Sequence, residues 1–164
     1  MQIELTAYLS VMIASIGIIG AVLYYVYALR SQTQMRKTDL IMRLYAMSLE
    51  RDLAEADAKV LALQVKDYRE FKKKYGSYFG TDPTALATRR IAGFFEGLGI
   101  LYSRNLIQID LVIDLFSIEF QWRRLGPILR GLREELGESE IGKHFELLYK
   151  AEKDFIESHA RKRV

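Results

Sequence analysis

The feature that most constrains this chain is a run of 25 residues, from Leu5 to Leu29, without a single charged side chain. An α-helix rises about 1.5 Å per residue, so a helix of this length more than covers a bilayer core of about 30 Å. A cleaved signal peptide has a positive segment followed by an apolar run of only about 7–15 residues. Here Glu4 is the one charged residue before the run. The sequence therefore predicts a permanent transmembrane anchor over residues 1–30.

The charges on either side of the apolar run predict its orientation. No Lys or Arg precedes the run, whereas Arg30, Arg36 and Lys37 follow it closely. Basic residues are in excess on the cytoplasmic side of membrane spans. We therefore expect a short N-terminus outside the cell membrane and a cytoplasmic C-terminal part. The three cations are also expected to meet lipid headgroups.

Small residues recur along one side of the predicted membrane helix, at alternating steps of three and four. Such a stripe lets the backbone of a neighbouring helix approach closely, which favours helix association in lipid. We expect the span to pack on a second copy of the chain or on another membrane protein. The alternative is that small residues are common in membrane helices and align by chance. The expected contact residues are Ala7, Ser10, Ala14, Gly17 and Ala21.

Residues 31–80 are expected to form an amphipathic linker helix. No Pro occurs before Pro83, and apolar residues between positions 49 and 75 recur mostly at helical spacing. The sequence leaves open whether the membrane helix continues unbroken into this linker, because Thr38-Asp39 also makes a plausible new helix start.

Residues 81–164 predict a small helical bundle. Thr81-Asp82-Pro83 is a strong helix start, because a capping side chain precedes a proline at the first helical position. A later apolar helix is expected to begin near Gln108 and to break or kink at Gly126-Pro127, before a separate short helix. Ser139 is expected to cap the last helix. Since no strand pattern with hairpin turns is present, the predicted fold class is all-α: one N-terminal transmembrane helix, a long linker helix and a small helical bundle.

Few residues of this domain have the patterns of a chemical site. The absence of Cys excludes disulfides and thiolate chemistry, and the two His residues lack metal-ligand spacing. The formal net charge of +3 is too small to favour nucleic acid as a partner. Glu96 lies in an apolar stretch, where we expect a structural ion pair with an arginine such as Arg133. We expect neither an enzyme nor a cofactor. The alternative is a membrane-tethered enzyme or ligand-binding domain with a site around Glu96, Asp110, Trp122 and Arg133.

A series of mostly core-type residues lies between Arg90 and about Phe155. It comprises Phe95-Glu96, Gly99, Leu101, Asn105-Leu-Ile, Asp110-Leu-Val, Trp122, Pro127 and Arg133. In this series the chain resembles an uncharacterised family of small single-span membrane proteins, mostly prokaryotic, whose helical domain has no known function. The resemblance covers about two-fifths of the chain. It implies an anchor, a helical linker and a helical domain in that order, and it implies no catalytic residue.

These features together lead us to expect a single-pass membrane protein whose cytoplasmic domain acts through protein–protein contacts. A scaffold, an adaptor or an accessory subunit fits this description. The expected partners are the lipid bilayer and either a second copy of the chain or another membrane protein. An anchor confines the domain to two dimensions, so its raised effective concentration strengthens a weak contact.

Overall fold

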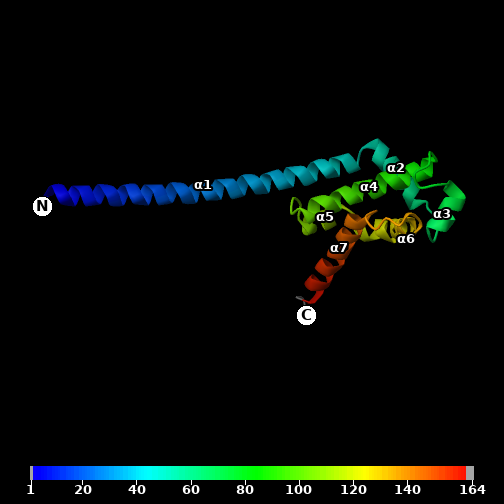
Figure 1. Ribbon diagram of the computed structural model, residues 1–164. Helices are drawn as coiled ribbons and strands as arrows, with labels where there is room; N and C mark the ends of the chain where they lie inside the picture. Colours follow the sequence, from blue (N-terminus) through cyan, green and yellow to red (C-terminus); the bar gives the residue numbers. More distant parts are fainter. Residues whose placement is uncertain (1, 162–164) are drawn as a thin grey trace. The chain divides into compact units, whose positions relative to one another are not determined.

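The computed structural model describes the backbone of residues 2–161 and the side chains of residue 12 and residues 14–160. Within this range the chain is all-α, with seven helices and no strand, which confirms the predicted fold class (Figure 1). The chain forms two compact units, Met1–Asp39 and Leu40–Val164. The helices are α1 (Gln2–Ser48), α2 (Arg51–Leu61), α3 (Tyr68–Tyr75), α4 (Pro83–Ser103), α5 (Ile109–Leu115), α6 (Ile118–Leu136) and α7 (Lys143–Arg161).

The described part of the first unit is helical and belongs to α1, which runs through 47 residues without a break and ends at Ser48 in the second unit. The helix of membrane-spanning length therefore continues into the segment expected to be the linker. Thr38 does not start a new helix, because its hydroxyl donates to the carbonyl of Gln34 inside α1 at 3.2 Å. The hydroxyl of Thr33 does the same to the carbonyl of Leu29 at 2.9 Å. Such bonds satisfy these side chains within the helix.

The second unit begins at Leu40, so the boundary differs from those expected at residues 30 and 80. Ile41 in the last turns of α1 is only 1% exposed. Tyr45, one turn later, packs edge-on against Phe116 with 6.1 Å between ring centroids. The end of α1 thus belongs to the helical domain, because the domain covers its apolar face.

The expected linker helix is divided into three helical segments rather than one. After α1 ends, α2 and α3 follow as separate helices, and the chain between Ala62 and Asp67 is not helical. Asp67, expected within a continuous helix, instead caps α3, since its Oδ1 accepts from the backbone N–H of Glu70 at 2.9 Å. α3 ends at Gly76, whose φ of 79° lies in the region that favours glycine.

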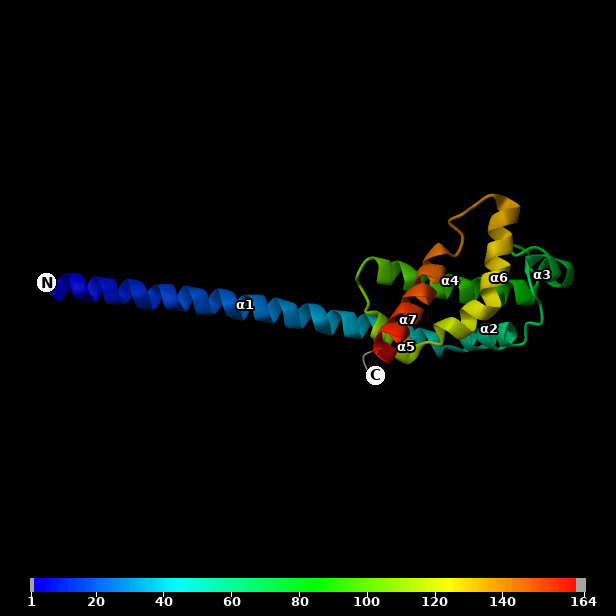
Figure 2. The same cartoon turned by 90° about the horizontal axis from the view of Figure 1, so that it is seen from below.

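The helix start expected at Asp82-Pro83 is confirmed. Oδ1 of Asp82 accepts from the backbone N–H groups of Thr84 and Ala85 at 2.7 and 3.2 Å. Pro83 is the first residue of α4, where its missing N–H removes no helical bond. α4 is the central helix of the second unit, with α2 and α7 packed against it (Figure 2).

The prediction of a helix break at Gly126-Pro127, with a separate short helix after it, was wrong. Both residues lie inside α6, and the break falls earlier, at Phe116-Ser117 between α5 and α6. Phe116 is 7% exposed and packs on Phe94 with 5.5 Å between ring centroids, so burial of its ring holds the turn. Around Pro127, α6 buries one long apolar face. The free energy gained by this burial offsets the loss of the backbone hydrogen bond that proline cannot donate.

The core of the second unit draws on all of its helices. Burial of each large apolar side chain contributes about 1.5–3 kcal/mol. One buried polar contact adds to this packing: Nε2 of Gln121 in α6 donates to Oδ1 of Asp57 in α2 at 2.6 Å. The most completely buried large side chains include those of Ile41, Val60, Phe71, Leu98, Val112, Ile118, Leu125, Ile128, Leu132, Phe145 and Leu148.

Candidate functional site

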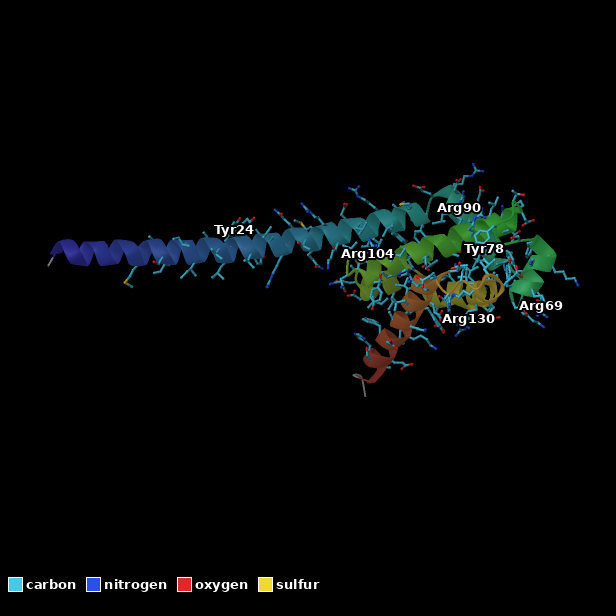
Figure 3. The ribbon with its side chains drawn as sticks, viewed as in Figure 1. Tyr24, Arg69, Tyr78, Arg90, Arg104 and Arg130 are labelled. Atoms are coloured by element: carbon cyan, nitrogen blue, oxygen red, sulfur yellow. The ribbon has the colours of Figure 1, made fainter. Side chains whose placement is uncertain are left out.

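The part of α1 between residues 14 and 29 presents an apolar surface that the rest of the described chain does not cover. Every side chain in this range is exposed except Ala28, which is half-buried. Ile16 and Leu23 each keep 66% of their surface exposed, and Tyr24 keeps 74% (Figure 3). By length and composition, this helix is able to cross a membrane. A contiguous apolar surface of this kind marks contact with lipid or with another protein.

The residues of the predicted stripe are uncovered as far as the structure describes them. Ala14, Gly17 and Ala21 are exposed, and no atom lies within 4 Å of a Cβ placed on Gly17. Ala7 and Ser10 lie outside the residues whose side chains are described. Helix association through this stripe therefore stays a prediction.

The basic residues that follow the span lie on the same helix, α1. Arg30 and Arg36 are exposed, and Lys37 is half-buried. They are available for contact with an anionic surface, and their role in orientation stays a prediction.

The carboxylate of Glu96 lies at the start of α7 rather than beside Arg133. Its Oε1 accepts from the backbone N–H of His144 at 3.2 Å and lies 2.8 Å from ring Nδ1 of the same residue. Its Oε2 accepts from the backbone N–H of Phe145 at 2.9 Å. Free N–H groups and the helix dipole both favour a carboxylate at this position. Glu96 in α4 therefore caps α7, and the expectation that Ser139 does so was wrong.

Arg133 pairs with Glu146, so the structure replaces the expected ion pair between Glu96 and Arg133. Nη1 of Arg133 lies 2.6 Å from Oε2 of Glu146, and the two side chains are only 18% and 20% exposed. Nε of Arg133 also donates to the carbonyl of Ile141 at 2.5 Å. The guanidinium thus ties α6 to both the loop before α7 and the first turn of α7.

The surroundings of Glu146 change its acidity. Burial by itself raises the pKa of this carboxyl, but hydrogen bonds and positive charge from Arg133 and Lys150 outweigh burial and lower the pKa below its ordinary value of 4.5. A lowered pKa means that the ionised carboxylate is the form that the fold stabilises.

A glycine permits the close contact between α4 and the start of α7. A Cβ at Gly99 would lie 2.1 Å from the carbonyl oxygen of His144, which is closer than atoms can approach. Because α7 starts directly against the α4 backbone here, the carboxylate of Glu96 reaches the first N–H groups of α7.

The two other members of the alternative site have contacts of different kinds. Asp110 is exposed, and its Oδ1 accepts from the backbone N–H of Leu111 at 2.9 Å. Trp122 is 3% exposed and contacts the rings of Phe145 and Tyr149, with centroid distances of 4.9 and 5.8 Å. Among the described residues, no group of three or more His, Asp or Glu side chains could hold a metal ion. The contacts of these residues are those of a folded core and its helix caps.

The sequence interpretation missed Glu152, which is only 7% exposed. Its Oε2 has no hydrogen-bond partner within the described part of the chain. Burial, the largest effect, raises the pKa of this carboxyl. The backbone N–H of Glu119 lowers the pKa, whereas the negative charge of the Glu119 side chain raises it. The net result is a pKa above the ordinary 4.5. The signal was available, because Glu152 lies four residues after Leu148 and hence on the apolar face of α7.

The fold and these contacts define a class of protein, one with a helix of membrane-spanning length and a small helical unit in which the half-buried carboxylates of Glu96 and Glu146 link neighbouring helices. The family model described as a domain of unknown function (DUF4760) matches residues 11–151, and the chain belongs to that family. This match confirms the resemblance to an uncharacterised family. No curated protein and no solved structure was found to match the chain.

Proposed function

We propose that this chain is a single-pass membrane protein that acts through protein–protein contacts, as a scaffold, an adaptor or an accessory subunit. The observation that carries the proposal is the uncovered apolar surface of α1 between residues 14 and 29. Removal of apolar surface from water is favourable by about 25 cal/mol per Å². A bilayer removes this surface from water along the whole length of the span. The described chain itself leaves the surface exposed.

The residues at the end of the apolar run support a defined position in the membrane. Tyr24, Tyr25 and Tyr27 are exposed just before Arg30. Aromatic rings favour the interface between lipid and water, and basic residues favour the cytoplasmic side. In the proposed topology the short N-terminal end lies outside the cell membrane and the second unit lies in the cytoplasm.

The proposed contact in the membrane is lateral and joins α1 to a second copy of the chain or to another membrane protein. Ala14, Gly17 and Ala21 leave room for a neighbouring backbone. Confinement to the membrane raises the effective concentration of the second unit, so even weak contacts between units are populated.

The topology is tested with single cysteines, since the natural chain has none. We expect Gln2→Cys to react with a membrane-impermeant maleimide in intact cells and Ser158→Cys to react only after permeabilisation. Alkaline carbonate should leave the protein in the membrane fraction. Release by carbonate contradicts the anchor, and the opposite labelling pattern contradicts the orientation.

Self-association is tested by light scattering on the full chain in mild detergent. Gly17→Leu is expected to weaken an oligomer, because a large side chain holds the helix backbones apart. Ile16→Leu is the matched control, since it exchanges one large exposed side chain for another on the same helix. A monomeric natural chain contradicts the second copy as partner.

A further inference from the structure

The part of α1 that follows the apolar run carries two exposed methionines, Met35 and Met42. Met35 keeps 63% of its surface exposed and Met42 keeps 50%. Ser31 and Thr38 are exposed as well. From Ser31 to Met35, Thr38 and Met42 the steps are four, three and four residues. With this period a helix presents one continuous line of side chains to a partner helix. We call Ser31, Met35, Thr38 and Met42 the methionine seam.

The helical domain leaves the methionine seam open. It covers Ile41, which is 1% exposed, and Tyr45, which packs on Phe116. Met42 directly follows Ile41, so its side chain leaves the helix about 100° away from that of Ile41. The seam ends at Met42, because the next position in its period is Tyr45, which the domain partly covers.

The polar member at the middle of the seam already has its hydrogen bond. The hydroxyl of Thr38 donates to the carbonyl of Gln34 inside α1 at 3.2 Å. A buried donor without a partner costs free energy, and this donor has its partner within its own helix. Burial of Thr38 in a helix contact therefore leaves no hydroxyl donor unsatisfied.

The basic residues of this part of α1 lie outside the seam. None of them occupies a seam position, and they are Arg30, Arg36, Lys37 and Arg43. In a parallel helix pair the positions that flank the seam face the partner as well. Between Ser31 and Met42 the flanking positions hold one charged residue, since they are Gln32, Gln34, Asp39 and Ile41. Two copies of this helix can therefore meet along the seam without placing arginines or lysines opposite one another.

The methionine seam continues the period of the small-residue stripe of the membrane span. From Ala21 the same alternating steps lead through Tyr24 and Ala28 to Ser31. Helix α1 has no break in this region. A parallel helix that packs along the span at this period is thus carried onto Met35 and Met42.

We propose that the methionine seam packs on the same seam of a second copy of the chain, as a parallel helix pair in register. The inference rests on the membrane topology proposed above, because two copies with the same orientation in one membrane have parallel α1 helices. A symmetric contact between identical chains requires a surface that is complementary to itself. The seam meets this requirement, since it is uncharged and its methionines adapt in shape to one another.

Disulfide formation between single cysteines tests the contact, since the natural chain has no Cys. The full chain is oxidised in its membrane with copper phenanthroline, and covalent dimers are measured by gel electrophoresis. We expect Met35→Cys and Met42→Cys to form severalfold more dimer than two exposed controls on α1. Arg36→Cys lies next to Met35, and Met47→Cys replaces a methionine outside the seam that is also 50% exposed. Equal yields at all four positions indicate random collision and overturn the seam, as does the lack of dimer at both seam positions.

Light scattering on the full chain separates failure of the seam from failure of the proposed function. An oligomeric natural chain without seam disulfides overturns the seam and leaves lateral association in place, whereas a monomeric natural chain overturns the second copy as partner altogether. The double variant Met35→Asp with Met42→Asp is expected to shift the oligomer severalfold toward monomer, and Met47→Asp is not. All three side chains are exposed, so the melting temperature of the second unit should stay unchanged. An unweakened oligomer in the double variant also overturns the proposal.

Discussion

A carboxylate from α4, that of Glu96, holds the start of α7. The two oxygens of Glu96 accept from the backbone N–H groups of His144 and Phe145, in the first turn of α7. Such caps act as cross-links, because each satisfies helix donors and at the same time fixes the distance between two helices. The effect of each residue is therefore measurable as stability of the whole second unit.

Glu96→Gln tests the cap of α7. The amide keeps the size of the side chain and one acceptor oxygen, but its NH₂ group replaces the other oxygen, so one of the two backbone N–H groups of α7 loses its acceptor. We expect a loss of about 1–3 kcal/mol in the free energy of unfolding, measured by denaturant titration followed by circular dichroism. Glu157→Gln, at an exposed site on α7, should stay within about 0.5 kcal/mol. Equal stability of the two variants would contradict the capping role.

Arg133→Met tests the ion pair with Glu146. The change leaves a largely buried carboxylate without its main partner, and we expect a loss of about 2–3 kcal/mol near neutral pH. The pKa of Glu146 is lowered in the folded chain. The stabilisation is therefore present above the ordinary carboxyl pKa of 4.5 and is lost as the pH falls through the lowered value. Denaturant titrations at several pH values should show the two chains converging in acid, and a constant difference contradicts this account.

At the scale of elements, the start of α7 sits directly on α4, and the helices exclude any side chain at Gly99. Gly93 lies on the same helix with nothing within 4 Å of a Cβ placed on it. An added methyl group would therefore clash at Gly99 and meet open space at Gly93, although both glycines lie within α4.

Gly99→Ala and Gly93→Ala form a matched pair. At Gly99 the methyl group forces α7 away from α4, and we expect destabilisation of about 1–3 kcal/mol or failure to fold. At Gly93 the same change should stabilise the unit by about 0.5–1 kcal/mol, because alanine favours a helix over glycine. Thermal unfolding followed by circular dichroism gives both values. A lower melting temperature for Gly93→Ala would show that its open surface is used in a contact.

At the scale of the whole molecule, the boundary at Leu40 separates an apolar helix with an uncovered surface from a unit with its own core. The last turns of α1 are part of that core through Ile41 and Tyr45. A truncation before Ile41 therefore leaves the core of the second unit intact, whereas a truncation after Tyr45 removes part of it.

Two fragments test this boundary. We expect residues 40–164 to be soluble and to unfold cooperatively, since the core is complete. Residues 50–164 lack Ile41 and Tyr45 and should be less stable by about 3–5 kcal/mol, from the apolar burial that they lose. Equal melting temperatures in circular dichroism would place the end of α1 outside the folding unit.

The sequence by itself determined the local features of this protein. The charge-free run predicted the helix of membrane-spanning length, Asp82-Pro83 predicted the start of α4, and the lack of alternating strands predicted the all-α class, because each depends on neighbouring residues alone. The tertiary structure decided the rest. Pro127 stays inside α6, Glu96 caps α7 in place of Ser139, and Arg133 pairs with Glu146, because packing and long-range polar contacts outweigh local preference where residues far apart in the chain meet.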